Sequence, residues 1–293
     1  MKKGLVQKKL RCVLSRLVCG EIRKGFLMFK YLFCAISLIA VCMFLGCSDG
    51  GDDNGGGLGV GIDSEEHATD GEERTINVGG ISIDVIFVAA GTFTQGGFNF
   101  GNSVSRQVTL TRGFWIGKYP VTQAQYQAVM GNNPSHFGGR PNNPVESVNW
   151  HNATEFASRV GGRLPTEAEW EFAAKGGNKS QGFIYSGSDN ADEVAWFVDN
   201  SSSSTQAVGQ KLPNELGIYD MSGNVFEWIG DWLANFDATA VTDPTGPLSG
   251  ANRMMRGGSW FGRATLCRVA VRYDNDPSYD WRNTGFRVVF DLK

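Results

Sequence analysis

Residues 217–228 read Gly-Ile-Tyr-Asp-Met-Ser-Gly-Asn-Val-Phe-Glu-Trp, and related phrases stand before and after them. Residues 163–173 read Arg-Leu-Pro-Thr-Glu-Ala-Glu-Trp-Glu-Phe-Ala, and Arg-Gly-Gly-Ser-Trp at 256–260 is followed by Gly-Phe-Arg at 285–287. The chain has 39 Gly among 293 residues, which predicts many loops and few long regular elements. Large buried aromatic rings suit the core of such a domain. We therefore predict core positions for the Trp residues of these phrases: Trp170, Trp228 and Trp260.

Capping residues mark the predicted helices. Thr122 is followed by Gln125, and Thr166 by Glu169, three residues later in each case, which is the pattern of a capping box. Between these two starts, apolar residues from Trp150 to Val160 recur on one helical face. The sequence therefore predicts three short helices, over 123–130, 150–160 and 167–175.

The predicted strands are short and lie apart in the sequence. Residues 81–88 alternate at first and then become a continuous apolar run, which indicates a strand that becomes buried. Further strands are predicted over 108–110, 114–116 and 286–290. Short helices and strands separated by long loops indicate an α+β domain with much irregular structure.

In their order and spacing, the three phrases resemble the formylglycine-generating enzyme or sulfatase-modifying-factor family. The resemblance extends over essentially all of residues 81–290. It implies a variant of the C-type lectin fold, with short helices, small antiparallel sheets and much irregular structure. We expect one such domain over 76–293, with a variable region at about 256–290.

The N-terminal part has the order of a bacterial lipoprotein signal. A basic start at Lys30 precedes an apolar run over 31–45, and Gly46-Cys47 resembles a lipobox. We expect an upstream extension at 1–27, a signal peptide at 28–46, lipidation of Cys47 and a flexible tether at 47–75. The alternative is a membrane-spanning helix, which would need roughly 20 apolar residues. Lipidation would anchor the protein in the cell envelope, at the outer membrane or cell surface.

Charge and cysteine content narrow the partners. Before Cys47 stand nine Lys and Arg and one Glu, so processing would leave 18 basic against 29 acidic residues. An acidic surface repels phosphate backbones, so we expect no nucleic-acid partner. Only Cys47 and Cys267 would remain of the six cysteines, and lipid would occupy Cys47. The mature chain would therefore have a single free thiol, and we expect a monomer.

The resemblance also bears on catalysis. The family's enzymes oxidise a substrate cysteine with copper held between two thiolates, and those positions match Gly262 and Cys267. A lone thiolate would hold Cu(I) weakly, so we predict no formylglycine chemistry and no catalytic cofactor, with Cys267 as a small buried apolar residue. An iron-dependent branch uses three histidines. We interpret His136 and His151 as surface residues instead, and His67 falls in the tether.

The resemblance implies a structural calcium site in the phrase at 217–228. Its ligands would be one side-chain oxygen, two backbone carbonyls and a Glu, matching Asp220, Gly223, Val225 and Glu227. Oxygen ligands in a tight Gly-containing loop suit Ca²⁺. A capped turn without metal is the alternative.

Residues 256–290 resemble the variable region of proteins diversified by a retroelement that mutates template adenines. Such mutagenesis changes Asn codons but never yields Lys, Glu, Gln or Met, and none of these four occurs between Arg256 and Phe290. Drift in an exposed loop is the alternative. The predicted ligand-binding positions are Phe261, Gly262, Arg263, Leu266, Val271, Tyr273, Asp274, Asp276, Ser278, Tyr279, Asp280 and Trp281.

These observations favour a non-catalytic, surface-displayed lipoprotein that binds a protein or glycan ligand through its variable region. Within the family, the chain most resembles the variable lipoproteins of the Treponema variable protein type. The residue mixture suits recognition, because aromatic side chains offer rigid contact area while Ser and Gly adapt. Two alternatives remain, an oxidase or sulfatase maturation factor of the formylglycine type, and a structural envelope lipoprotein.

Overall fold

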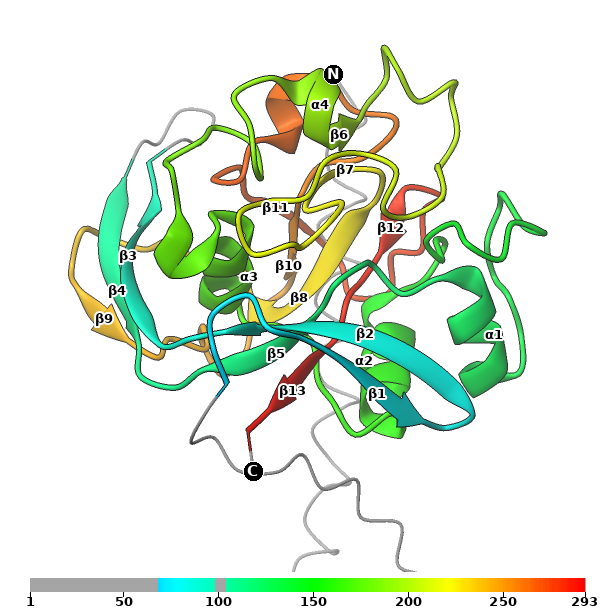
Figure 1. Cartoon of the computed structure of the whole chain (residues 1–293), viewed down its shortest axis with the longest axis horizontal. Coiled ribbons are helices and arrows are strands. Elements are labelled where there is room, and N and C mark those ends of the chain that lie inside the picture. The colour runs from blue at the N-terminus through cyan, green and yellow to red at the C-terminus, as the bar shows by residue number, and fades with distance from the viewer. Residues whose placement is uncertain (1–67, 98–103, 293) are drawn as a thin grey trace, which may run out of the picture. The chain divides into compact units, whose positions relative to one another are not determined.

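The computed structural model describes residues 68–97 and 104–292, which form short helices and small sheets joined by long loops (Figure 1). The α+β prediction is therefore confirmed. The predicted upstream extension, the predicted signal peptide, Cys47 and residues 47–67 of the predicted tether lie outside the described residues. Within the described ranges, no helix combines the length and the apolar character that a bilayer crossing requires.

The first sheet separates two hydrophobic clusters. Residues of β2 alternate between them, with Ile83 and Val85 packed in the first cluster and Ile86 and Val88 in the second. This two-sided burial explains why the sequence of β2 ends as a continuous apolar run. The strands are antiparallel in the order β1-β2-β5-β13: β1 (Glu73–Val78), β2 (Ile81–Val88), β5 (Phe114–Gly117) and β13 (Val289–Asp291).

The second sheet is built around β8. Its order is β11-β10-β8-β12, from β11 (Tyr273–Asn275), β10 (Arg253–Arg256), β8 (Phe226–Trp232) and β12 (Thr284–Gly285). A third sheet joins β3 (Gly91–Gly96), β4 (Ser105–Leu110) and β9 (Val241–Thr242), and a fourth joins β6 (Ala195–Trp196) and β7 (Ser222–Gly223). The long pairings are antiparallel as expected, whereas the two-residue pairings β12–β8, β4–β9 and β6–β7 are parallel.

The helices cover the two faces of the first sheet, as Figure 1 shows. Side chains of α1 (Gln123–Met130) and α2 (Trp150–Arg159) pack in the first cluster, and those of α3 (Glu167–Ala174) in the second. Both predicted capping boxes are present, and Gly131 closes α1 in the left-handed conformation. The remaining helical pieces are single turns: η2 (Gly177–Lys179), α4 (Ala191–Val194) and η3 (Ala264–Cys267).

Several predicted boundaries were wrong; β4, for example, begins at Ser105 rather than at 108. β1 begins at Glu73, inside the predicted tether, because Arg74 stacks on the ring of Trp115 at 4.7 Å and long-range contacts order this segment. The predicted strand over 286–290 narrows to β13, because residues 286–288 carry the chain from β12 in the second sheet to β13 in the first.

A buried ion pair lies where the chain crosses between the sheets. Glu227 of β8 and Arg287 are both fully buried, and the Arg287 Nε and Nη2 atoms donate to the two carboxylate oxygens at 2.7 Å. Arg287 also donates to the carbonyls of Gly117 and Tyr219, and Trp170 Nε1 donates to Glu227 at 2.7 Å. One ion pair thus joins the three sequence phrases that indicate the fold.

Replacing one member of this pair is expected to destabilise the domain. Arg287→Met leaves the Glu227 carboxylate buried without a counter-charge, which costs about 3–5 kcal/mol of unfolding free energy, measured by urea denaturation. Adding Glu227→Gln to Arg287→Met should restore part of that loss, because no charge then remains buried. In the control Arg159→Met, the lost partner Glu155 is half exposed, so we expect less than about 1 kcal/mol. Equal losses in the two single variants would contradict this view of the pair.

Candidate ligand-binding site

A pocket of about 370 Å³ opens in the C-terminal segment and gathers much of the predicted variable region. Seven of the twelve predicted ligand-binding residues line it: Phe261, Gly262, Arg263, Leu266, Tyr273, Tyr279 and Trp281. They come from two stretches, 261–266 around η3 and 273–281 from β11 onward. The fold therefore brings residues separated by up to 20 positions in the sequence into one concave surface.

Aromatic rings form much of the pocket wall. Tyr279 and Trp281 stack with ring centroids 5.7 Å apart, and Tyr273 stacks on Phe226 at 5.0 Å. Phe261, Tyr273 and Trp281 nevertheless stay 54%, 45% and 52% exposed. Half-exposed rings held in pairs offer contact area to a ligand with little side-chain entropy left to lose.

The core beneath the pocket is fixed by buried tryptophans, as predicted. Trp170, Trp228 and Trp260 are all buried. Trp228 Nε1 donates to the carbonyl of Val148 at 2.8 Å, and Trp260 Nε1 donates to that of Arg282 at 3.0 Å. The bond from Trp260 to Arg282 joins the two stretches that line the pocket to the core, so side chains of the pocket can change without loss of the scaffold.

Arg256 holds the chain where it leaves the sheet. Its guanidinium is fully buried and donates to Glu171 at 2.6 Å and to the carbonyls of Val269 and Val271 at 2.8 and 3.0 Å. Val271 is itself buried, so its predicted position on the ligand-binding face is wrong. Val271 belongs to the support because its carbonyl is a partner of Arg256, a relation that sequence spacing does not reveal.

Four other predicted positions lie outside the pocket lining. Asp274 accepts a hydrogen bond from Asn252 Nδ2 at 2.7 Å. Asp276 accepts from the backbone N–H and the hydroxyl of Ser278, at 2.8 and 2.6 Å, which fixes a turn. Asp280 is exposed. These side chains lie beside the pocket, where Asp274 and Asp276 shape the chain, and their role in binding stays a prediction.

The sequence prediction missed four lining residues: Phe226, Met255, Ser259 and Asn283. Phe226 and Met255 belong to the first hydrophobic cluster, so the pocket floor is the outer edge of the core. The alternation of side chains along a strand could have identified Phe226. Neighbouring residues of a strand point to opposite faces, and Glu227 points to Arg287, so Phe226 points to the other face, where the pocket lies.

The two positions that match the copper thiolates are not equivalent in this fold. Gly262 lines the pocket, whereas Cys267 is fully buried in a third cluster with Phe197 and Ala195. Burial raises the pKa of the Cys267 thiol to about 12, which disfavours the thiolate that copper needs. The prediction of a small buried residue is confirmed for Cys267, the free cysteine of the described residues.

His136 and His151 are exposed, and each packs edge-on against its neighbouring aromatic ring, Phe137 or Trp150. Their interpretation as surface residues is confirmed. Among the residues that the structure describes, no group of three or more His, Cys, Asp and Glu side chains has the arrangement of a metal site.

The residues of the predicted calcium site fit a cation only in part. Asp220 is buried, with hydrogen bonds from Gly209 N–H at 2.7 Å and Asn224 Nδ2 at 3.4 Å, and burial raises the pKa of its carboxyl to about 6. A nearby cation would compensate that carboxylate. Glu227, however, already receives Arg287 on both oxygens, and the guanidinium would repel a metal ion. Calcium at Asp220, Gly223, Val225 and Glu227 stays a prediction.

Residues 81–292 match the family described as the sulfatase-modifying factor enzyme 1-like domain. A chaperone protein named LppX from Paenibacillus barcinonensis is 34% identical over 265 residues, spanning 71% of this chain and 90% of that protein. A formylglycine-generating enzyme of Streptomyces coelicolor is 37% identical over 175 residues, which cover 54% of this chain and 55% of the enzyme.

Among solved structures, the Treponema denticola variable protein 1 superposes with a TM-score of 0.71 at 32% identity. The match covers 75% of this chain and 99% of the other. The structure called PvdO from Pseudomonas aeruginosa has a TM-score of 0.62 at 24% identity and therefore shares the fold. These likenesses bear out the C-type-lectin-like fold of the sulfatase-modifying-factor type and the resemblance to variable proteins.

The raised pKa of Asp220 predicts a pH-dependent stability. The folded state binds this proton more tightly than the unfolded state, so the contribution is fully present below about pH 4 and is lost as pH rises through 6. Asp220→Asn is therefore expected to stabilise the domain by up to about 3 kcal/mol near pH 7.5, with little difference near pH 4. Urea denaturation at the two pH values measures this difference.

Bound calcium would stabilise the wild type relative to Asp220→Asn near pH 7.5, the opposite of the result expected without the metal. If Ca²⁺ binds the Asp220 carboxylate, millimolar CaCl₂ should raise the melting temperature of the wild type near pH 7.5 but not that of Asp220→Asn. The increase should shrink as pH falls below 6, because protonation competes with the metal. An unchanged wild-type melting temperature in CaCl₂ compared with EDTA would count against the calcium site.

Proposed function

Since this chain belongs to the sulfatase-modifying factor family, we propose that it uses the family's scaffold to bind a ligand in its C-terminal pocket, without catalysis. The observation that carries the proposal is the wall of half-exposed aromatic rings, Phe261, Tyr273 and Trp281, around a pocket of about 370 Å³. Solvent-exposed aromatic side chains at a concave surface are the usual anchors of protein recognition.

The charges of the pocket indicate what a ligand should offer. Arg263 is the charged side chain among the lining residues, and no carboxylate lines this pocket. A guanidinium beside aromatic faces favours a ligand with flat apolar area and a hydrogen-bond acceptor or negative group. Protein and glycan ligands both carry such features, so either class suits the site.

We further propose that a retroelement diversifies the variable region over residues 256–290. The similarity to a Treponema variable protein supports it, as does the absence of Lys, Glu, Gln and Met between Arg256 and Phe290. The geometry supports it too, because seven candidate variable positions meet in one pocket over a buried scaffold. Substitutions there change a surface without removing the core.

The non-catalytic part rests on the residues at the copper positions. Gly262 offers no thiolate, and the Cys267 thiol is buried with a raised pKa. An oxidase remains the alternative, because the chain is similar to the Streptomyces coelicolor formylglycine-generating enzyme over 55% of that enzyme's length. A lipid at Cys47 would place the pocket on the cell envelope, at the outer membrane or cell surface.

Truncating the exposed rings is expected to abolish binding while the fold persists. Peptides selected from a phage-displayed random library against the wild-type protein, and glycans that the wild-type protein binds on an array, supply the ligands. The triple variant Phe261→Ala, Tyr273→Ala and Trp281→Ala should lose at least about tenfold in affinity for them. A matched variant, Ile184→Ala, Leu212→Ala and Leu248→Ala, removes exposed apolar side chains that do not line the pocket and should keep it. Ligands held equally by both variants would overturn the proposal.

Sequences of the same locus from several isolates test the diversification. Differences are expected to concentrate between Arg256 and Phe290, at pocket residues and at codons derived from adenine. Buried support residues such as Arg256, Val271 and Arg287 should stay constant, because their loss would unfold the scaffold. Differences spread evenly along the domain would instead favour a structural envelope protein.

A further inference from the structure

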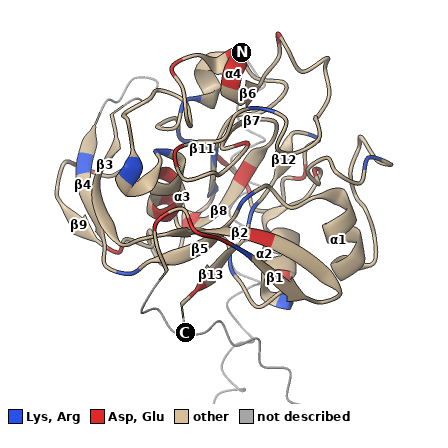
Figure 2. Ribbon diagram, viewed as in Figure 1, with Lys and Arg blue, Asp and Glu red and all other residues tan. Residues whose placement is uncertain are grey.

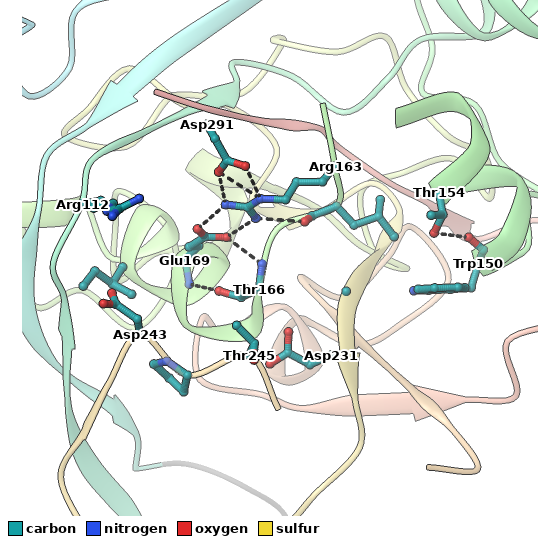
Figure 3. A pocket seen from close by; sticks show the side chains of 14 residues that line it. Arg112, Trp150, Thr154, Arg163, Thr166, Glu169, Asp231, Asp243, Thr245 and Asp291 are labelled. Carbon is teal, nitrogen blue, oxygen red and sulfur yellow. Dashed lines mark hydrogen bonds and ion pairs between the residues drawn. The ribbon is translucent and has the colours of Figure 1, made fainter. Parts of the chain in front are cut away.

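Figure 3 shows a second pocket, which is lined by Gly230 and Asp231 of β8, whereas the aromatic pocket is lined by Phe226 at the start of this strand. Its volume is about 530 Å³, and it shares no lining residue with the first. Phe226 lines the aromatic pocket and Asp231, five residues further along β8, lines the second. We call this second site the Asp231 pocket.

Most charges in the Asp231 pocket already have partners. Figure 3 shows Arg163 between two carboxylates, donating to Glu169 at 2.7 Å and to Asp291 at 2.6 Å. Asp243 accepts from the backbone N–H and the hydroxyl of Thr111, at 2.8 and 2.6 Å. These side chains bind within the protein and need no ligand.

Among the four carboxylates that line the pocket, Asp231 is the exception. The residue is 94% buried, and its Oδ1 atom accepts one hydrogen bond, from the Glu167 N–H at 3.2 Å, while Oδ2 accepts none from the described residues. The nearby Arg272 gives its side-chain donors to Glu167, at 2.6 and 2.8 Å, and to Ala234. Burial and the negative charge of Glu167 together raise the pKa of the Asp231 carboxyl to about 7.

The surroundings select the kind of partner that Asp231 lacks. An ionised carboxylate only accepts hydrogen bonds, so the partner must be a donor. Four carboxylates and two guanidiniums line the pocket, so its charge favours a cation over a neutral hydroxyl. Leu110, Leu164 and Pro244 add apolar wall that suits a short alkyl chain.

We propose that the Asp231 pocket binds a primary alkylammonium group, which donates to the free oxygen of Asp231. The ammonium supplies the missing donors together with a positive charge, and its alkyl chain lies along the apolar wall. Because this site lies apart from the aromatic pocket, the proposal does not depend on the function proposed above.

Ligand-observed NMR titration of the full-length protein tests the proposal with matched four-carbon probes. The n-butylammonium ion represents a free amine, and N-acetyl-lysine methylamide represents a lysine side chain. Their neutral counterparts are n-butanol and N-acetyl-norleucine methylamide. At least one ammonium probe should bind about tenfold more tightly than its counterpart, and the pair that does so identifies the source of the group. Equal binding of neutral and charged probes overturns the proposal.

Variants locate the binding. Asp231→Asn keeps the side-chain shape and removes the charge, so it should lower the affinity at least about tenfold. Asp276→Asn, in a turn beside the aromatic pocket, should leave it unchanged. Retained affinity in Asp231→Asn contradicts the proposal.

A second pair of variants keeps Asp231 intact. Thr245 is exposed and lines the pocket next to Gly246, whose added Cβ would lie 2.9 Å from that of Asp231. Thr245→Lys therefore supplies an ammonium from the chain itself and should block the probes. Ser249→Lys adds the same charge at an exposed position outside the pocket lining and should not. Equal probe affinity in the two lysine variants also overturns the proposal.

Discussion

The fold depends on the buried ion pair between Glu227 and Arg287. Taking two charges out of water costs several kcal/mol per ion, and close hydrogen bonds must offset this cost. Here they do: Glu227 receives both Arg287 and Trp170, and Arg287 also reaches the carbonyls of Gly117 and Tyr219. Those partners come from both main sheets, from α3 and from the loop before β7. Apolar packing alone would not specify how these parts meet, whereas directional bonds from one guanidinium do.

A second buried arginine fixes the backbone that supports the aromatic pocket in the C-terminal segment. Arg256 binds Glu171 of α3 and the carbonyls of Val269 and Val271, and so fixes the chain between the two stretches that form the aromatic pocket. Gly258 lets η3 lie close, because a Cβ there would stand 2.7 Å from the Cys267 sulfur. The pocket side chains project from this support. Figure 2 shows that Lys and Arg positions elsewhere are spread over several elements and interspersed with Asp and Glu.

The sequence predicted correctly those elements that are determined by interactions between residues close together in the chain. The capping boxes at Thr122 and Thr166 predicted two helices to within one residue, because the cap and its partner lie three residues apart. The prediction failed where distant contacts decide. β1 is ordered by Arg74 on Trp115, and Val271 is buried by bonds to Arg256. Seven pocket residues were predicted by their types and by the family resemblance, whereas the floor, Phe226 and Met255, came from core strands that the variable segment does not include.

The arrangement of β8 makes its two pockets separate sites on one rigid element. Between Phe226 at one end and Asp231 near the other, Glu227, Trp228 and Ile229 are all fully buried. Their side chains are held by the ion pair, by the bond from Trp228 to Val148 and by core packing. Coupling between two sites requires an element with two arrangements that both ligands favour differently. The buried ion pair and the core packing hold β8 in its observed arrangement, so we expect changes in the aromatic pocket to leave the carboxylate of Asp231 in place. We therefore expect substitutions in one pocket to leave the chemistry of the other unchanged.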